Sequence, residues 1–91
     1  MNNYLIYLSF LLQQKFDHYI QHRLSRHQSV YNAVQAGVHT LNEIAKHAYA
    51  DAPSAHPGLA KDQTLSHLMA HQRAGMLTEE SSVWNITGAK P

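Results

Sequence analysis

The sequence HPGLAKDQTLSHLMAHQRAG, from His56 to Gly75, decides the fold, because it is the most clearly bounded helix pattern in the chain. Pro57 stands at the first helical position, where the missing N–H has no helical partner to lose. Gly75 follows the last periodic residue, where a left-handed backbone is favourable mainly for glycine. Between these ends the three- and four-residue spacings predict an apolar stripe, formed by Leu59, Leu65, Leu68, Met69 and Gln72.

A β-hairpin is predicted directly after this helix. Met76-Leu77-Thr78 and Val83–Thr87 are β-prone runs, and the polar segment Glu79–Ser82 lies between them as the turn. Trp84, on the second run, is expected to pack the hairpin onto the preceding helix, and the alternative is a stacking platform for a nucleic-acid base.

Two shorter helices are predicted upstream. The first runs to Ala36 and ends at Gly37, and the second begins at a Thr40–Glu43 capping box and ends at Tyr49. The inner face of the second helix is expected to contain Leu41, Ile44, Ala45 and Ala48. Residues 25–91 therefore have the order helix, helix, helix, hairpin, which predicts a winged helix-turn-helix: a mainly α fold with a small β-hairpin.

An extra N-terminal helix is predicted before this domain. Residues 4–12 are almost wholly apolar, and the spacing of Phe16, Tyr19, Ile20 and Leu24 continues the helical pattern. Ser25 and Gln28 then match a capping box, so a helix end, a new helix start and a domain boundary are predicted at this point. The predicted domains are an apolar helix over 1–24 and a winged-helix domain over 25–91, with a single bent helix as the alternative.

The apolar N-terminal helix predicts self-association. Its apolar run is about half of the roughly 20 residues that span a membrane, and its flanks lack the features of a secretory signal, so a membrane anchor is the less favoured interpretation. An apolar helix without a core of its own tends to pair with another copy. We expect a homodimer through this helix, with contacts from Tyr4, Leu5, Leu8, Leu11, Leu12 and Phe16.

The amino-acid composition excludes several classes of function. The chain has no cysteine, which excludes thiolate metal sites and cysteine nucleophiles and fits a cytoplasmic location. Its net charge is +1 with 14% charged residues, which is not the electrostatic footprint of a strong nucleic-acid binder. Protonating all eight histidines would raise the formal charge from +1 to +9.

Several of these residues occur in a known family pattern. The elements Tyr19-Ile20-x-His22-Arg23, Tyr49-Ala50, His56-Pro57 with Ala60, His67-Leu68 and Gly75 resemble the C-terminal winged-helix domain of metallo-β-lactamase-fold hydrolases, in the branch of the lactamase-like endoribonucleases. The resemblance covers about Phe16 to Leu77. It implies that residues 1–24 are either an association arm or a remnant of the hydrolase domain's last helix, and that a hydrolase domain is a candidate partner.

The chain also departs from that family. The H-x-H-x-D-H metal motif of the hydrolase domain is absent, Gln28 replaces a glutamate, and Ala70-His71 replace a lysine–leucine pair. Without the metal ligands, no centre lowers the pKa of a water, so no enzymatic activity and no cofactor are expected. The resemblance implies a non-catalytic accessory and interaction domain of such a hydrolase; an oligomerisation remnant without other function is a further alternative.

Two histidine pairs are candidate metal ligands. His18 with His22, and His67 with His71, are each four residues apart and would project from one helical face. Such pairs can hold zinc or nickel adventitiously, but structural or exposed histidines are the favoured interpretation.

A small dimeric winged-helix regulator that binds DNA is the alternative function. The third helix offers Lys61, Gln63, His67, His71 and Arg73 as candidate nucleic-acid contacts. Glu79 and Glu80 in the hairpin would repel phosphate, and few cations stand beside them, so weak or no nucleic-acid binding is expected.

Overall fold

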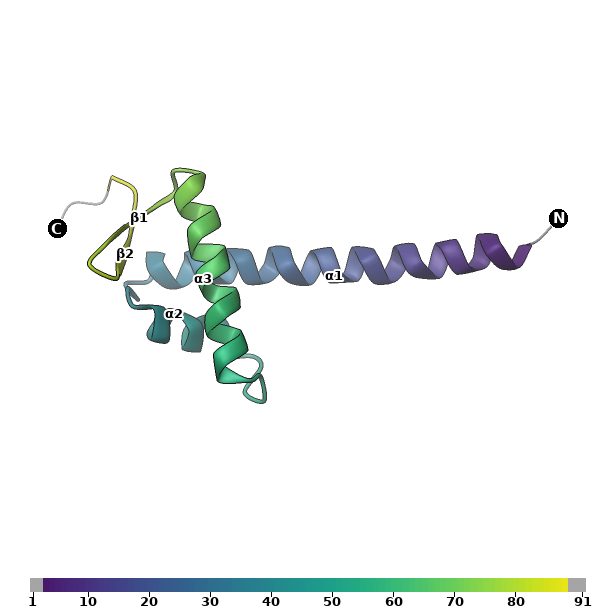
Figure 1. Ribbon diagram of the computed structural model, residues 1–91, viewed down its shortest axis with the longest axis horizontal. Helices are drawn as coiled ribbons and strands as arrows, with labels where there is room; N and C mark the ends of the chain where they lie inside the picture. The colour runs from purple at the N-terminus through teal and green to yellow at the C-terminus, as the bar shows by residue number, and fades with distance from the viewer. Residues whose placement is uncertain (1–2, 89–91) are drawn as a thin grey trace.

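The computed structural model of the protein describes residues 3–88, with side chains from Leu5 onward. It contains three helices, α1 (Asn3–Gln35), α2 (Leu41–Ala48) and α3 (Pro57–Arg73), followed by strands β1 (Leu77–Glu80) and β2 (Val83–Ile86). Figure 1 shows α2, α3 and the hairpin gathered around the C-terminal end of α1, while the rest of α1 projects alone. The described part measures 64 × 29 × 18 Å. The prediction of a mainly α fold with a small β-hairpin is confirmed.

Helix α1 is continuous, so the predicted helix end and restart at residues 25–29 are wrong. No glycine or proline occurs before Gly37, so nothing in the backbone forces a break. Gln28 does not reach back to cap a new helix; its Nε2 donates to Oδ1 of Asn32, one turn onward, at 2.9 Å. The predicted end at Gly37 is confirmed, because Gly37 has φ +97° and Val38 donates to the carbonyl of Ala33.

The core lies where the last turns of α1 meet the other elements. Its buried side chains come from all five elements: Val30, Ala33, Val34, Ile44, Ala48, Leu68, Leu77 and Trp84. Residues 5–24 of α1 contribute nothing to this cluster. Whether the chain divides into domains at residue 25 stays a prediction, although the helix itself runs through that position.

Helix α2 forms much as the sequence predicts. Thr40 is the N-cap, although its side chain makes no capping hydrogen bond, and Tyr49 is the C-cap. Ile44, Ala45 and Ala48 are buried and Leu41 is half-buried.

Helix α3 has the predicted ends and a different buried face. Pro57 is in the first turn, and the His56 imidazole accepts hydrogen bonds from the N–H groups of Gly58 and Leu59. Gly75 has φ +77°. The predicted apolar stripe is wrong except at Leu68, because Leu59, Leu65, Met69 and Gln72 are exposed. The buried residues are Ala60, Thr64, His67, Leu68 and His71.

The hairpin has a tighter turn than predicted. Glu79 and Glu80 belong to β1, and the turn consists of Ser81 and Ser82, with φ of +52° and +67°. Leu77 pairs with Ile86 and Glu80 with Val83. Trp84 is buried in the core cluster, and its backbone N–H donates to the carbonyl of His39 at 2.9 Å.

Candidate interaction surface

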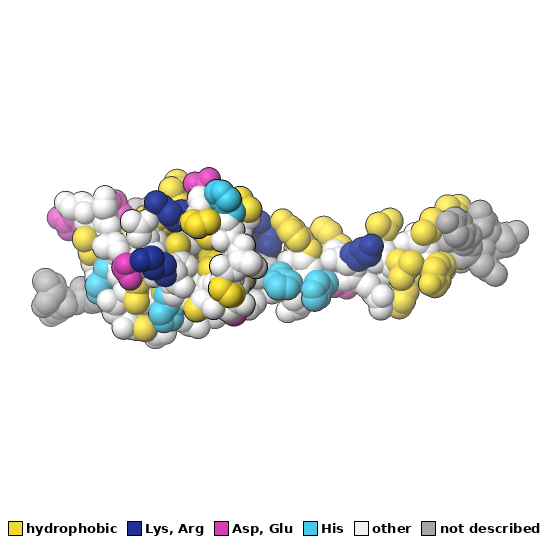
Figure 2. Space-filling view, turned by 90° about the horizontal axis from the view of Figure 1, so that it is seen from below, with side chains coloured by type: hydrophobic (Ala, Val, Ile, Leu, Met, Phe, Trp, Pro, Cys, Tyr) yellow, Lys and Arg dark blue, Asp and Glu magenta, His cyan; other side chains and the backbone are white. Residues whose placement is uncertain are grey.

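The projecting part of α1 carries many exposed large apolar side chains. Leu12 is 68% exposed, Leu5 61% and Phe16 58%, while Leu8 is 37% exposed and Leu11 half-buried. Tyr4, the remaining predicted contact, has a side chain that lies outside the described residues. Figure 2 shows hydrophobic side chains gathered along this length of the helix. Further large apolar side chains are exposed on the same segment: Ile6, Tyr7, Phe10, Tyr19, Ile20 and Leu24.

No element of the described chain covers this surface. Contiguous exposed apolar patches on a folded protein commonly mark sites where another surface binds. Scattered exposed leucines would need no explanation, but these side chains follow one helix for about six turns. In the described range 3–88, no helix has an apolar window long enough to cross a bilayer.

Arg26 joins α1 to the end of α2. Its guanidinium donates to the carbonyl of Ala48 and to Oδ1 of Asp51, the latter at 2.7 Å, and it lies 4.1 Å from the ring centre of Tyr49. The hydrogen bond and the charge of Arg26 lower the pKa of Asp51. The Tyr49 hydroxyl donates to Oε1 of Gln63 at 2.6 Å, which ties this junction to α3. These contacts attach α1, at Arg26, to the end of α2 and to α3.

Three histidines form a cluster where α1 crosses α3. Nδ1 of His27 lies 2.9 Å from Nδ1 of His67, and the His27 ring stacks on that of His71 at 3.7 Å between centroids. His71 donates its Nε2–H to the carbonyl of His27 at 2.9 Å. His67 and His71 are buried and His27 is half-buried. The cluster replaces apolar packing between the two helices with ring stacking and hydrogen bonds.

Two members of the cluster, His27 and His67, are held neutral by their surroundings. Burial, followed by the charges of His27 and Arg23, lowers the pKa of His67 to about 4. Burial, followed by the charges of His71 and Arg23, also lowers the pKa of His27. These side chains are therefore uncharged near neutral pH.

The two predicted metal pairs lie in different surroundings. The rings of His18 and His22 are 5.0 Å apart, edge to face, on the exposed part of α1. His67 and His71 are buried with His27 instead of meeting the first pair. Across residues 3–88, no three His, Cys, Asp or Glu side chains are grouped so that they could hold a metal ion.

The predicted nucleic-acid contacts do not share one surface. Lys61 and Arg73 are exposed, but His67 and His71 are in the buried cluster. Gln63 is exposed and accepts the hydrogen bond from Tyr49.

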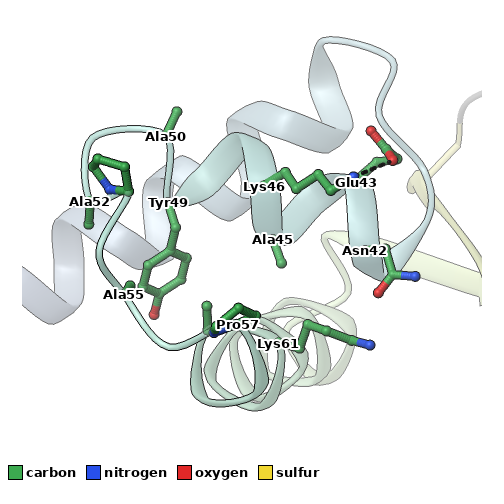
Figure 3. Close-up of a pocket in the computed structure, with 12 residues that line it drawn as sticks. Asn42, Glu43, Ala45, Lys46, Tyr49, Ala50, Ala52, Ala55, Pro57 and Lys61 are labelled. Carbon is green, nitrogen blue, oxygen red and sulfur yellow. Dashed lines mark ion pairs between the residues drawn. The ribbon is translucent and has the colours of Figure 1, made fainter.

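A shallow hollow of about 540 Å³ lies between α2, the following loop and α3 (Figure 3). Small side chains leave this space open, among them Ala45, Ala50, Ala52 and Ala55, and Tyr49 and Pro57 complete its wall. Glu43 and Lys46 pair at its rim at 3.6 Å. The size and mainly apolar lining of this hollow suit a small apolar side chain or group.

Sequence analysis identified the exposed α1 surface but missed the role of His27. His27 stands in a polar stretch that resembled a helix boundary, and its partners are 40 and 44 residues away. The spacing of His67 and His71 correctly placed both on one face of α3, and that face proved to be the buried one. Comparisons with protein-family models, curated proteins and solved structures give no match to this chain.

Proposed function

We propose that the protein is a non-catalytic interaction module with a winged-helix fold, which forms a homodimer through the exposed face of α1. The observation that carries this proposal is the uncovered apolar surface over residues 5–24. A cytoplasmic location and the absence of enzymatic activity belong to the same proposal and stay predictions.

The element order supports the winged-helix part of the proposal. The end of α1, then α2, α3 and a β-hairpin, follow in the order of that fold. His39, between α1 and α2, makes two hydrogen bonds with Trp84 of β2. Its carbonyl accepts from the backbone N–H of Trp84 at 2.9 Å, and its Nδ1–H donates to the carbonyl of Trp84 at 2.8 Å. A short extended segment beside the hairpin is what a wing attached to a three-helix core requires.

The energetics of α1 support association. Residues 5–24 of α1 contribute no side chain to the core, and most of the stability of a helix in a protein comes from packing an apolar face. Burying one leucine or phenylalanine side chain contributes about 1.5–3 kcal/mol. A second copy supplies an equally apolar helix, so the facing side of α1 is covered in both chains at once.

The role as accessory domain of a metallo-β-lactamase-fold hydrolase is the second candidate. It is favoured by Tyr19 and Arg23, two residues of the resembling pattern, which interact on the exposed part of α1, with Nη1 of Arg23 3.4 Å from the tyrosine hydroxyl. In this case a hydrolase domain would cover the surface instead of a second copy.

DNA binding is less well supported. Two of the five predicted contacts are buried, and the exposed side of α3 also carries Asp62, Leu65 and Met69. Glu79 and Glu80 on β1 add negative charge where a wing would approach phosphate.

Light scattering on the whole chain tests the proposal. We expect twice the 10.3 kDa chain mass for the wild type and a shift toward the single mass for Leu12→Glu. Gln14→Glu, an exposed substitution on another side of the helix, is the matched control and should leave the mass doubled. A wild type that stays at the single mass at every concentration would overturn the homodimer and leave a hydrolase domain as the candidate partner.

A further inference from the structure

We propose that the two α1 helices pair antiparallel, with a two-fold axis at Leu12. This inference rests on the proposed homodimer and specifies its geometry. It is carried by the spacing of one apolar stripe on the exposed part of α1. The stripe consists of Leu5, Leu8, Leu12, Phe16 and Tyr19.

These side chains share one face of the helix. At 100° per residue they fall within an arc of about 80°. The same arc contains Val30 and Val34, which are buried against α2 and α3. The stripe is therefore the continuation of the core-facing side of α1 beyond the point where its own chain stops covering it.

The spacing of the stripe is palindromic. The steps between successive residues are three, four, four and three, so the stripe reads the same in both directions from Leu12. An antiparallel copy turned about Leu12 places Leu5 opposite Tyr19 and Leu8 opposite Phe16. Each of these contacts joins one aliphatic and one aromatic side chain, which fills the space between two helices more evenly than pairs of like size, and Leu12 meets its own copy at the axis.

The charged side chains of α1 also favour antiparallel over parallel pairing. In the antiparallel register, Lys15 beside the stripe aligns with Ser9 of the second copy, so it does not meet a like charge. A parallel, in-register pair would align Lys15 and Arg23 each with its own copy. Like charges held side by side on paired helices are destabilising.

The stripe reaches the folded body at its last residue. Tyr19 lines a small hollow together with Arg23, Tyr49 and Gln63, so the antiparallel register places Leu5 of the second copy at the edge of the folded body. Burying ten such side chains removes on the order of 1,000 Å² from water, which is the lower end for a specific dimer.

Cysteine cross-linking of the full chain tests the register, because the natural sequence contains no cysteine. Leu12→Cys should form a covalent dimer under mild oxidation, because the two positions meet at the axis. Gln14→Cys, one half-turn away on the helix, is the matched control and should lose this cross-link. An equimolar mixture of Leu5→Cys and Tyr19→Cys should cross-link as the mixed pair, with little product from either variant alone.

The outcomes separate the register from the dimer itself. Efficient self-linking of Leu5→Cys and of Tyr19→Cys would overturn the antiparallel register and indicate a parallel pair. A doubled mass by light scattering with equal linking at positions 12 and 14 would overturn the register alone. A single mass for the wild type would overturn the homodimer. If Leu12→Cys weakens association, the mixture of Leu8→Cys with Phe16→Cys tests the same register with the axis residue intact.

Discussion

At the scale of single residues, the contact between α1 and α3 depends on the protonation of histidine. Nδ1 of His27 and Nδ1 of His67 lie 2.9 Å apart, so one of them must donate and the other accept. If both rings become charged, both nitrogens carry a proton and the contact turns repulsive. Arg23, Arg26 and His71 add positive charge around the pair, and the nearby carboxylate of Asp51 already pairs with Arg26.

We predict that acid weakens the fold through this cluster. His67 takes up a proton near pH 6.5 in the unfolded chain but near pH 4 in the folded chain, so the unfolded state binds more protons between these values. The contribution of His67 is complete above pH 6.5 and is lost as the pH falls toward 4, and we expect a loss of about 2 kcal/mol in the free energy of unfolding.

Urea denaturation at fixed protein concentration between pH 7 and pH 4 measures this loss. The variant His67→Gln should flatten the pH dependence, whereas the matched control His47→Gln, at an exposed position on α2, should retain it. Equal slopes in the two variants would contradict the role of the cluster.

A second prediction at this scale concerns Thr64. Its side chain is fully buried, and among the described residues its Oγ1 has no hydrogen-bond partner. Replacing a buried, unsatisfied hydroxyl by a methyl group of the same shape removes a desolvation cost. We expect Thr64→Val to raise the free energy of unfolding by about 1 kcal/mol, whereas Thr78→Val, on the exposed side of β1, should change it little. Destabilisation by Thr64→Val would show that the hydroxyl is satisfied in solution.

At the scale of the elements, local signals predicted helix ends well where glycine or proline sets the backbone. Pro57, Gly75 and Gly37 mark the ends of α3 and α1 as the sequence predicts. The capping-box pattern at Ser25 failed, because polar residues also fit inside a helix when the backbone can continue and the next turn packs on a core.

The buried face of α3 was not predictable for a related reason. Periodicity selected Leu59, Leu65 and Met69, but burial depends on which side of the helix meets α1 and α2. The buried rings of His67 and His71 have hydrogen-bond partners in the ring and the carbonyl of His27, and His27 is distant from both in the sequence. The apolar character of residues 4–12 was predictable from the sequence, whereas their exposure depends on the direction in which α1 leaves the folded body.

The hairpin turn gives a prediction at this scale. Ser81 and Ser82 both have positive φ, which suits Asn-Gly much better than two serines. We expect Ser81→Asn with Ser82→Gly to stabilise the fold by roughly 0.5–1 kcal/mol in denaturant titrations. The backbone N–H of Ser82 donates to Oε2 of Glu79 at 2.8 Å in the natural turn, and a glycine at this position keeps that donor. Ser54→Gly, in the loop before α3, is the control and should give no gain; a loss from the double variant would contradict the turn geometry.

At the scale of the whole molecule, the chain is a small folded body at one end of a helix that extends well beyond it (Figure 1). The firm junction at Arg26 and the histidine cluster fix the direction of this helix relative to the body. The exposed length of α1 can therefore present its apolar stripe to a second copy in a defined orientation.

Small-angle X-ray scattering on the wild-type chain tests this account most directly, because it reports mass and longest dimension together. Antiparallel pairing about Leu12 places the two folded bodies at opposite ends of the shared helices. We predict a doubled mass and a longest dimension of about 100 Å, compared with 64 Å for one chain. A doubled mass with a longest dimension near that of one chain would contradict the antiparallel register. A single chain mass at every concentration would contradict the central claim, that the exposed face of α1 is a surface for self-association.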